Sequence, residues 1–383
     1  MTLVIVFWSC LAVVLYVYCG YPLLLWCNAL GRRRPPSGNT AVIEELPVVS
    51  VIIPAHNEAG VISAKLENLL QLDYPKERLE IVVGSDGSID GTEGIVSRYA
   101  CHGVRLVASR KQVGKSGIQN AAVEAATGEI LLFTDADTLI STDGLLRMVA
   151  RFRDPSLGLV TVSPRFANLG ETAIAENEGL YWKYENWLRR QESDRGLLAA
   201  ASGSCFAMRR ALWRPLDPNV GDDFVLPLQV LLRGYRNVVE ERVRTTIWLL
   251  QNSGPTMLRM KVRIISKDLR GLIANRAVMN PLGTGPTALA LVSHKLLRWL
   301  VPYFLIVAAV SNCLLLDRMF YRLTFGAQIV FYATAAVGFA LRGVKNRVPF
   351  STVFSFCLVN YAALLGTLHF ALGRTTGCWK PVR

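Results

Sequence analysis

Leu131-Leu132-Phe133-Thr134-Asp135-Ala136-Asp137 joins a short apolar run to two carboxylates that are separated by one residue. The apolar residues that follow Glu129 have the character of a buried strand, which we predict over Glu129–Phe133. Alternate side chains of a strand share a face, so Asp135 and Asp137 can project together beyond its end. Two convergent carboxylates repel each other, and a divalent cation with oxygen ligands removes that repulsion. The stretch therefore predicts a strand that ends at a site for Mg²⁺ or Mn²⁺. The alternative is a turn in which one Asp caps and the other is exposed.

Short β-branched runs alternate with helical stretches on both sides of this segment, from Leu46 to about Glu241. Such alternation predicts an α/β domain with a mostly parallel sheet and helices on its faces. In such sheets ligands bind at the carboxyl ends of the strands, near a change in strand order. The predicted strands are Val49–Ile53, Leu79–Val83, Val104–Val107, Glu129–Phe133, Leu159–Ser163 and Cys205–Arg209. The predicted helices are Glu58–Gln71, Thr92–Tyr99, Ser116–Ala126, Thr142–Phe152 and Glu171–Gln191.

Polar turns follow the first two predicted strands. After Val51–Ile53 come Pro54 and a turn that ends at Glu58, and this turn can present backbone groups and a carboxylate to a base or ribose. After the second strand, Gly84-Ser85-Asp86-Gly87-Ser88 places Asp86 to accept a hydrogen bond from a uracil or ribose. The simpler interpretation of both stretches is a helix start or a turn with local capping.

A second acidic pair, Gly221-Asp222-Asp223-Phe224, precedes a predicted helix over Val225–Leu232. One carboxylate of the pair can act as a general base toward a hydroxyl, and adjacent carboxylates raise one pKa. Negative charge at a helix start also complements the helix dipole, and both roles are compatible.

Gly114-Lys115-Ser116 is similar to the end of a phosphate-binding P-loop, but Ser109 stands where that motif requires glycine. An ATPase is therefore excluded. Lys115, with Arg110 and Lys111, remains a candidate point charge for a diphosphate.

Long apolar segments flank this domain. Val4–Leu30 carries no charge and is followed by Arg32–Arg34, which predicts a retained span whose end lies in the cytoplasm. Leu300–Leu316, Phe325–Leu341 and Val353–Leu372 approach or reach the length of a spanning helix, giving about four transmembrane helices. The first of these three runs is short and contains a proline, so a re-entrant segment is an alternative.

The formal net charge is +13, and many basic residues lie beside apolar segments. That placement favours anionic membrane lipids as partners and argues against nucleic acid. Residues from Pro255 to Ala274 have apolar side chains at helical spacing with Lys and Arg between them, which predicts an amphipathic helix at the membrane interface. The eight cysteines form neither a disulfide framework nor a zinc pattern.

These segments divide the chain into six parts. They are an N-terminal transmembrane helix (1–30), a linker (31–45), the α/β domain (46–252), amphipathic interface helices (253–299), transmembrane helices (300–373) and a tail (374–383). The expected location is the cell (inner) membrane, multi-pass, with the α/β domain in the cytoplasm.

In this order the motifs resemble glycosyltransferase family 2, whose catalytic domain has the nucleotide-sugar-binding GT-A fold. The likeness is to the membrane-embedded branch with the hyaluronan, chitin and cellulose synthases. The resemblance implies that Asp86 binds uridine, and that Asp137 with Asp135 holds the metal and diphosphate. It also implies that Asp223, beside Asp222, is the catalytic base. Within Ser202-Gly203-Ser204-Cys205-Phe206, it places Gly203 and Ser204 in the acceptor pocket.

One motif departs from that family. Processive members carry Gln-x-x-Arg-Trp on an interfacial helix, where this chain has Arg259-Met260-Lys261-Val262-Arg263. Arg259 and Arg263 are therefore the candidate acceptor-side residues of this helix. Lys295-Leu296-Leu297-Arg298-Trp299 adjoins a predicted span and is interpreted as a set of interface anchors. Without the tryptophan motif, the sequence does not predict processivity.

The resemblance implies a membrane-bound, inverting, metal-dependent glycosyltransferase. It would move a sugar from a nucleotide-sugar, a UDP-sugar, to a growing polysaccharide or a lipid-linked acceptor. Two alternatives stay open. One is transfer of a single sugar to a polyprenyl phosphate or glycolipid. The other is a non-catalytic membrane subunit of a polysaccharide export complex.

Overall fold

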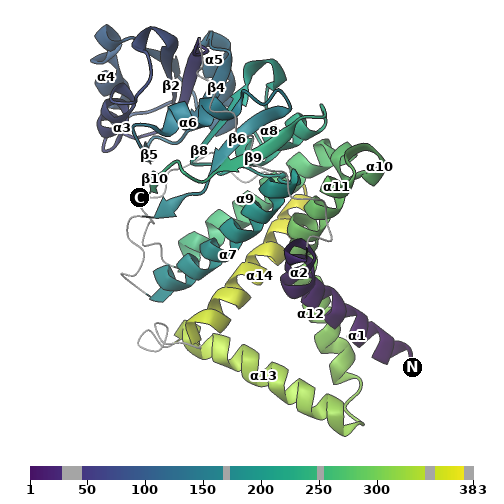
Figure 1. Cartoon of the computed structure of the whole chain (residues 1–383). Coiled ribbons are helices and arrows are strands. Elements are labelled where there is room, and N and C mark those ends of the chain that lie inside the picture. The colour runs from purple at the N-terminus through teal and green to yellow at the C-terminus, as the bar shows by residue number, and fades with distance from the viewer. Residues whose placement is uncertain (28–44, 167–172, 248–253, 341–349, 375–383) are drawn as a thin grey trace.

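The computed structural model describes residues 1–27, 45–166, 173–247, 254–340 and 350–374. In these residues an α/β domain adjoins a group of long helices (Figure 1). This group contains both the first and the last helix of the described chain. The expected α/β domain with a mostly parallel sheet is present. The predicted basic cluster at Arg32–Arg34 and most of the predicted linker lie outside the described residues.

A seven-stranded sheet forms the centre of the α/β domain, in the order β3-β2-β1-β4-β8-β6-β9. Its first four strands are parallel, β8 is antiparallel to both of its neighbours, and β9 is parallel to β6. The chain adds β2 and β3 on one side of β1 and then returns to place β4 on the other side. The strand order therefore changes between β1 and β4, as expected for a ligand site at their carboxyl ends. The strands are β1 (Val49–Ala55), β2 (Leu79–Asp86), β3 (Val104–Ser109), β4 (Ile130–Thr134), β6 (Leu157–Val162), β8 (Cys205–Arg209) and β9 (Arg236–Glu240).

Apolar side chains cover both faces of this sheet. In β1, Val51 and Ile53 belong to one core and Ile52 to the other, because successive strand residues point to opposite faces. The first core packs α3 (Ile62–Leu70), α4 (Thr92–Ser97) and α6 (Gly144–Arg151) against the sheet. The second packs α5 (Lys115–Ala125) and α8 (Asp222–Leu231). All predicted strands and helices of this domain are present, with ends that shift by a few residues.

A small second sheet has the order β5-β10-β7, with β5 at Leu139–Ile140, β7 at Arg165–Phe166 and β10 at Thr245–Ile247. The sequence did not predict these strands or β9. Strands of two or three residues are too short for a periodic pattern, and β9 begins with Arg and Asn.

Three long helices lie between the sheet and the far end of the molecule (Figure 1). They are α7 (Ala173–Arg195), α9 (Gly254–Ala274) and α14 (Phe350–Ala371), and α14 contacts both of the others. Gly366 of α14 permits close packing on α9, since a side chain there would start 2.9 Å from Ile265 Cβ. Short helices α10 (Pro281–Thr284) and α11 (Pro286–Leu291) then lead to α12 (Leu297–Cys313) and α13 (Met319–Ala340).

Among the described residues, three helical segments are long and apolar enough to cross a membrane: Thr2–Trp26, Pro286–Cys313 and Phe350–Ala371. The first combines α1 (Thr2–Leu15), a π-turn and α2 (Tyr21–Trp26); the second joins α11, a π-turn (Val292–Leu296) and α12. The run that looked short from Leu300 thus belongs to a helix of 28 residues. The remaining predicted run, Phe325–Leu341, is helical up to Ala340 as part of α13, and the number of spans stays a prediction.

Candidate active site

Two polar loops meet at the carboxyl ends of β1 and β2. His56 Nδ1 lies 2.7 Å from the Asp86 carbonyl oxygen, and the Ile89 amide donates to Asn57 Oδ1 at 2.9 Å. Asn57 has φ +55°, a left-handed conformation that asparagine tolerates better than most residues. Pro54 lies in β1 opposite Gly84, and the amide of the buried Glu58 donates to Thr92 Oγ1 at 2.8 Å. The two predicted donor-side turns therefore form one connected structure.

Asp86 is fully buried at the end of β2. Its two carboxylate oxygens accept hydrogen bonds from the backbone amides of Val113 at 2.6 Å and Gly114 at 3.0 Å. Gly114 has φ +85°, and the next residue, Lys115, starts α5. Asp86 thus holds the loop that delivers Lys115, and its contact with uridine stays a prediction.

Lys115 connects two of the acidic motifs. Its Nζ lies 2.8 Å from Asp135 Oδ1 and 3.5 Å from Asp222 Oδ1. Burial lowers the pKa of Lys115, but Asp135, Asp222 and Asp223 outweigh this and raise it well above its usual range. Burial raises the pKa of Asp135, and Lys115 opposes that change. Lys115, which the sequence suggested as a positive charge for a diphosphate, therefore stays protonated beside the Asp135 carboxylate.

Strand β4 ends at Thr134, so Asp135 and Asp137 lie in the turn that follows it, and a shared direction of their side chains stays a prediction. The Asp135 amide donates to the Ser204 carbonyl at 3.2 Å, which ties the turn to the strand start of β8. Within the described part of the chain, no three His, Cys, Asp or Glu side chains gather into a group that could hold a metal ion. Mg²⁺ is usually held by one or two protein carboxylates together with substrate phosphates. The pair thus fits a cation shared with a phosphate ligand.

Sequence reasoning missed Lys65, which lies under this turn. It is fully buried, and its Nζ donates to Thr134 Oγ1 at 2.8 Å and to the Thr138 carbonyl. Burial lowers the pKa of Lys65 to about 8, although Cys205, Asp135 and Asp137 oppose the change. The available signal was its position on the apolar face of α3, together with Ile62, Leu66 and Leu69.

Asp222 and Asp223 begin α8 and have different surroundings. Gln119 Nε2 donates to Asp222 Oδ2 at 2.8 Å, so Asp222 is held by α5 and by Lys115. Asp223 lies over Gly203, where a side chain would start 3.0 Å from Asp223 Oδ2. Burial and Asp222 raise the pKa of Asp223 to about 6. The structure brings Gly203 to the predicted base, and Ser204 supports the Asp135 turn through its carbonyl.

A further carboxylate, that of Asp268 in α9, approaches Asp223. A side chain on Gly221 would start 3.1 Å from both Asp223 Oδ1 and Asp268 Oδ1. Burial and Asp223 raise the pKa of Asp268 well above its usual range. The sequence signal was that Asp268 is the single acidic residue in the otherwise basic α9.

The two predicted acceptor-side arginines lie at different distances along α9. Arg263 is five residues from Asp268, about 7 Å along the axis, and burial lowers its pKa. Arg259 is exposed, donates to Thr256 Oγ1 at 3.4 Å and lies about 14 Å from Asp268 along the axis. The structure thus places Arg263 nearer to the site than Arg259.

The interpretation of Lys295, Arg298 and Trp299 as interface anchors is wrong. Glu185 Oε1 lies 3.2 Å from Lys295 Nζ, and Glu185 Oε2 lies 2.8 Å from Arg298 Nη1. Trp299 is buried and packs edge-on against Phe224, the residue after Asp223, with ring centroids 5.7 Å apart. The two cations thus pair with Glu185 of α7, and the indole ring packs on Phe224 of α8. The local sequence pattern could not reveal these partners.

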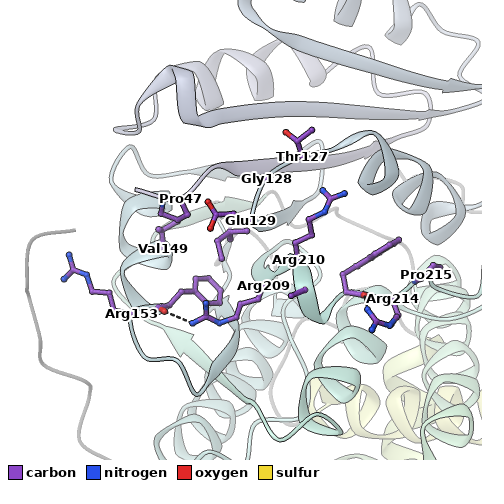
Figure 2. A pocket seen from close by; sticks show the side chains of 14 residues that line it. Pro47, Thr127, Gly128, Glu129, Val149, Arg153, Arg209, Arg210, Arg214 and Pro215 are labelled. Atoms are coloured by element: carbon purple, nitrogen blue, oxygen red, sulfur yellow. Dashed lines mark hydrogen bonds between the residues drawn. The ribbon is translucent and has the colours of Figure 1, made fainter. Parts of the chain in front are cut away.

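A cavity of about 940 Å³ lies at the opposite edge of the sheet. Its lining includes Gly128 before β4 and Arg210 after β8, which are the strand ends farthest from Asp135. Figure 2 shows that Arg153, Arg210 and Arg214 at its rim point in different directions. This hollow is therefore separate from the candidate active site.

Comparison with known proteins agrees with this geometry. Residues 50–215 match the family described as "Glycosyl transferase family 2". The chain is 29% identical over 249 residues to a beta-monoglucosyldiacylglycerol synthase of Nostoc sp., covering 60% of this chain and 53% of that protein. It is 30% identical over 226 residues to an N-acetylglucosaminyltransferase of Rhizobium meliloti, covering 53% of each. The chain thus spans about half the length of these curated relatives.

A solved structure with a similar fold covers nearly the whole chain. It is the mannosyltransferase PcManGT from Pyrobaculum calidifontis in complex with GDP-Man and Mn²⁺, with a TM-score of 0.73 and 22% sequence identity. The match covers 96% of this chain and 99% of that one, so it includes the long helices as well as the sheet. At this identity the likeness establishes the fold.

Proposed function

Since residues 50–215 form a glycosyltransferase family 2 domain with the GT-A fold, we propose that the chain is a membrane-bound, inverting glycosyltransferase. It moves a sugar from a nucleotide-sugar, a UDP-sugar, to a growing polysaccharide or a lipid-linked acceptor. One observation carries this proposal. The ends of β1, β2 and β4 and the start of α8 bring Asp86, Lys115, Asp135 and Asp223 together where the strand order changes.

The donor lies across the ends of β1, β2 and β4. Pro54, Glu58 and Asp86 form the wall for the nucleoside, and Lys115 neutralises the diphosphate. Asp135 and Asp137 would hold Mg²⁺ or Mn²⁺; PcManGT, the solved structure of similar fold, was obtained with Mn²⁺. When bound, the cation supplies positive charge that stabilises the departing diphosphate.

Asp223 accepts the proton of the acceptor hydroxyl as that oxygen attacks the anomeric carbon. Direct displacement by the acceptor inverts the configuration of that carbon. The position of Asp223 above Gly203 supports this role, since glycine has no side chain that would cover the carboxylate on the acceptor side. Asp222 is engaged by Gln119 and Lys115 and acts on Asp223 through its charge.

The acceptor is held at a membrane. Three helical segments among the described residues are apolar and long enough to span a bilayer, and α9 is basic and amphipathic. This supports a multi-pass protein of the cell (inner) membrane, with the catalytic domain in the cytoplasm and anionic lipids around α9. Gly203, Ser204 and Arg263 face this acceptor side, with Arg259 farther along the helix.

Transfer of a single sugar to a membrane lipid is a second candidate. In the comparable stretch of α9, Arg259–Arg263, the last position holds Arg263 where the processive motif has tryptophan. Without a tryptophan on α9, this helix has less means of holding a growing polymer. The name of the Nostoc sp. relative, a glucosyldiacylglycerol synthase, supports the same class of acceptor.

The test is transfer from a panel of labelled UDP- and GDP-sugars by the full chain in membranes, with products separated into lipid and polymer fractions. Asp137→Ala and Asp223→Asn are expected to lose at least about 100-fold in rate, in line with the loss of metal or base chemistry. Asp73→Asn, on an exposed turn, is the matched control. Full transfer by both active-site variants contradicts the proposal. Absence of metal-dependent sugar-nucleotide hydrolysis by the purified protein would favour the non-catalytic alternative.

A further inference from the structure

Helices α8 and α9 approach each other closely at one glycine. A side chain on Gly271 would overlap Val225 Cγ2 and would also come within 3.7 Å of Phe224. Glycine at this position therefore allows the backbone of α9 to lie directly against α8. Asp268 precedes Gly271 by one helical turn, so the same contact brings its carboxyl to the start of α8.

The Asp268 carboxyl is placed beside Asp223 by this packing. Both Oδ1 atoms lie 3.1 Å from the position of a side chain on Gly221, a point that glycine leaves vacant. Both residues are half-buried, and α8, α9 and the turn at Gly203 surround this point. Two carboxylates that approach one point in this way repel each other, so ionising both costs free energy.

The surrounding charges do not remove this conflict. Asp222 of α8 adds to the negative charge at both carboxyls, and Asp135 of the β4 turn adds to it at Asp223. Three lysines oppose them: Lys115 of α5 acts on Asp223, Lys267 of α9 acts on Asp268, and Lys295 acts on both. Burial is the largest influence on each carboxyl, and it favours the neutral form.

Resting on the role of Asp223 as the base, we propose that Asp268 is a positioning residue whose carboxyl keeps its proton at neutral pH and presents it to Asp223. The pair then carries one negative charge, which stays on Asp223. The proton of Asp268 fixes the orientation of that carboxylate and leaves its other oxygen for the acceptor hydroxyl. Transfer then proceeds with Asp223 accepting the acceptor proton while Asp268 keeps its own.

This arrangement makes the base depend on the interface helix. Asp268 reaches Asp223 only when α9 lies against α8, and α9 is in turn packed on α14 through Ile265 and Gly366. Helices α9 and α14 thus place Asp268 beside the proposed catalytic base, Asp223.

The proton can be tested without substrate. Infrared spectra of the purified full chain at pH 7 are expected to contain the carbonyl band of a protonated carboxylic acid. This band disappears in Asp268→Asn and persists in Asp73→Asn. A spectrum in which Asp268→Asn loses only carboxylate bands overturns the proposal, whether or not the protein transfers sugar. Loss of transfer by the wild type, with the band present, would contradict the proposed function alone.

The positioning role is tested by comparing an amide, which still donates a hydrogen bond, with a side chain that cannot. Asp268→Asn is expected to retain at least about ten times the kcat of Asp268→Ala, with an acid limb of the pH–rate profile near that of the wild type. In Asp268→Ala the acid limb moves to higher pH, because the Asp223 carboxylate has lost a donor, and the KM for the donor sugar is unchanged. Equal losses in both variants, or a wild-type profile in Asp268→Ala, overturn the proposal.

Discussion

At the scale of single residues, two lysines bind the turn after β4 from opposite sides. Lys115 pairs with Asp135 from the ligand side, and Lys65 donates to Thr134 and Thr138 from the interior. Supporting partners of this kind orient metal ligands, and losing them commonly costs 10–100-fold in metal affinity. We therefore expect Lys65 to support the proposed cation site, although it is not one of the proposed ligands.

We expect Lys65→Met to raise the Mn²⁺ concentration that gives half-maximal transfer by about tenfold, with a much smaller change at saturating metal. The methionine keeps the volume of the buried side chain but cannot donate to the Thr138 carbonyl, so the turn is held less firmly. A metal titration of activity measures this effect. Lys76→Met, at an exposed position, is the control, and an unchanged metal requirement in Lys65→Met would refute the role.

The raised pKa of Asp223 predicts the pH dependence. A base acts in its deprotonated form, so wild-type kcat/KM should fall as pH drops through about 6. In Asp222→Asn a neighbouring negative charge is gone, which lowers the pKa of Asp223 and moves this acid limb to lower pH, by up to about one unit. A pH–rate profile of both proteins decides the matter. A limb that moves upward in Asp222→Asn would show that Asp222 does not raise the pKa of Asp223.

At the scale of elements, the active site depends on how closely α9 packs on α8. The Gly271 contact has no room for a methyl group, since Val225 is stiff and lies directly opposite. Overpacking of this kind typically costs about 1–3 kcal/mol and displaces the backbone. The displacement would separate Asp268 from Asp223.

Gly271→Ala is therefore expected to lower kcat several-fold, with little change in the KM for the donor sugar. Combining it with Val225→Ala restores the space and should recover most of the lost rate, although Val225→Ala alone leaves a cavity. Steady-state kinetics of the three variants test the contact. If the double variant is no better than Gly271→Ala, the helix spacing is not what limits the reaction.

At the scale of the whole molecule, a buried ion network joins the catalytic domain to the apolar helices. Glu185 of α7 contacts Lys295, Arg298 and His294 Nε2, and Glu192 Oε1 accepts from Tyr21 Oη of α2 at 2.6 Å. Burial raises the pKa of Glu185, but Lys295, His294 and Arg298 outweigh it and hold the pKa well below its usual range. A depressed carboxyl pKa means that this stabilisation is complete at neutral pH and is lost only in strong acid.

Glu185→Gln should therefore destabilise the folded protein in detergent by about 3–5 kcal/mol, because two cations lose their buried partner. The matched control is Glu241→Gln, whose pair with Arg190 is largely exposed and should be worth less than about 1 kcal/mol. Thermal unfolding followed by tryptophan fluorescence compares the two. Similar small losses in both variants would mean that the network does not hold the helices to the domain.

The sequence by itself determined the order of strands and helices and the predicted metal, donor and base residues. These signals are local, because an apolar run followed by acidic or glycine residues identifies a strand end without any tertiary information. Parallel strands of one sheet end at the same edge, so Asp86, Asp135 and Asp137 could be expected to lie near one another. Strand β9, the two- and three-residue strands and the partners of Glu185 gave no comparable local pattern.

Only the tertiary structure decided what surrounds those carboxylates. Lys65, Asp268 and Trp299 reach the site from α3, α9 and α12, which are distant in the sequence, and each looks like an ordinary surface or interface residue when read locally. The Asp86 carboxylate likewise turned out to bind two backbone amides. Burial, charge pairing and helix spacing are properties of the packed molecule. They set the pKa of Asp223 and bring Asp268 to it, whereas the residue types alone set the kind of chemistry available.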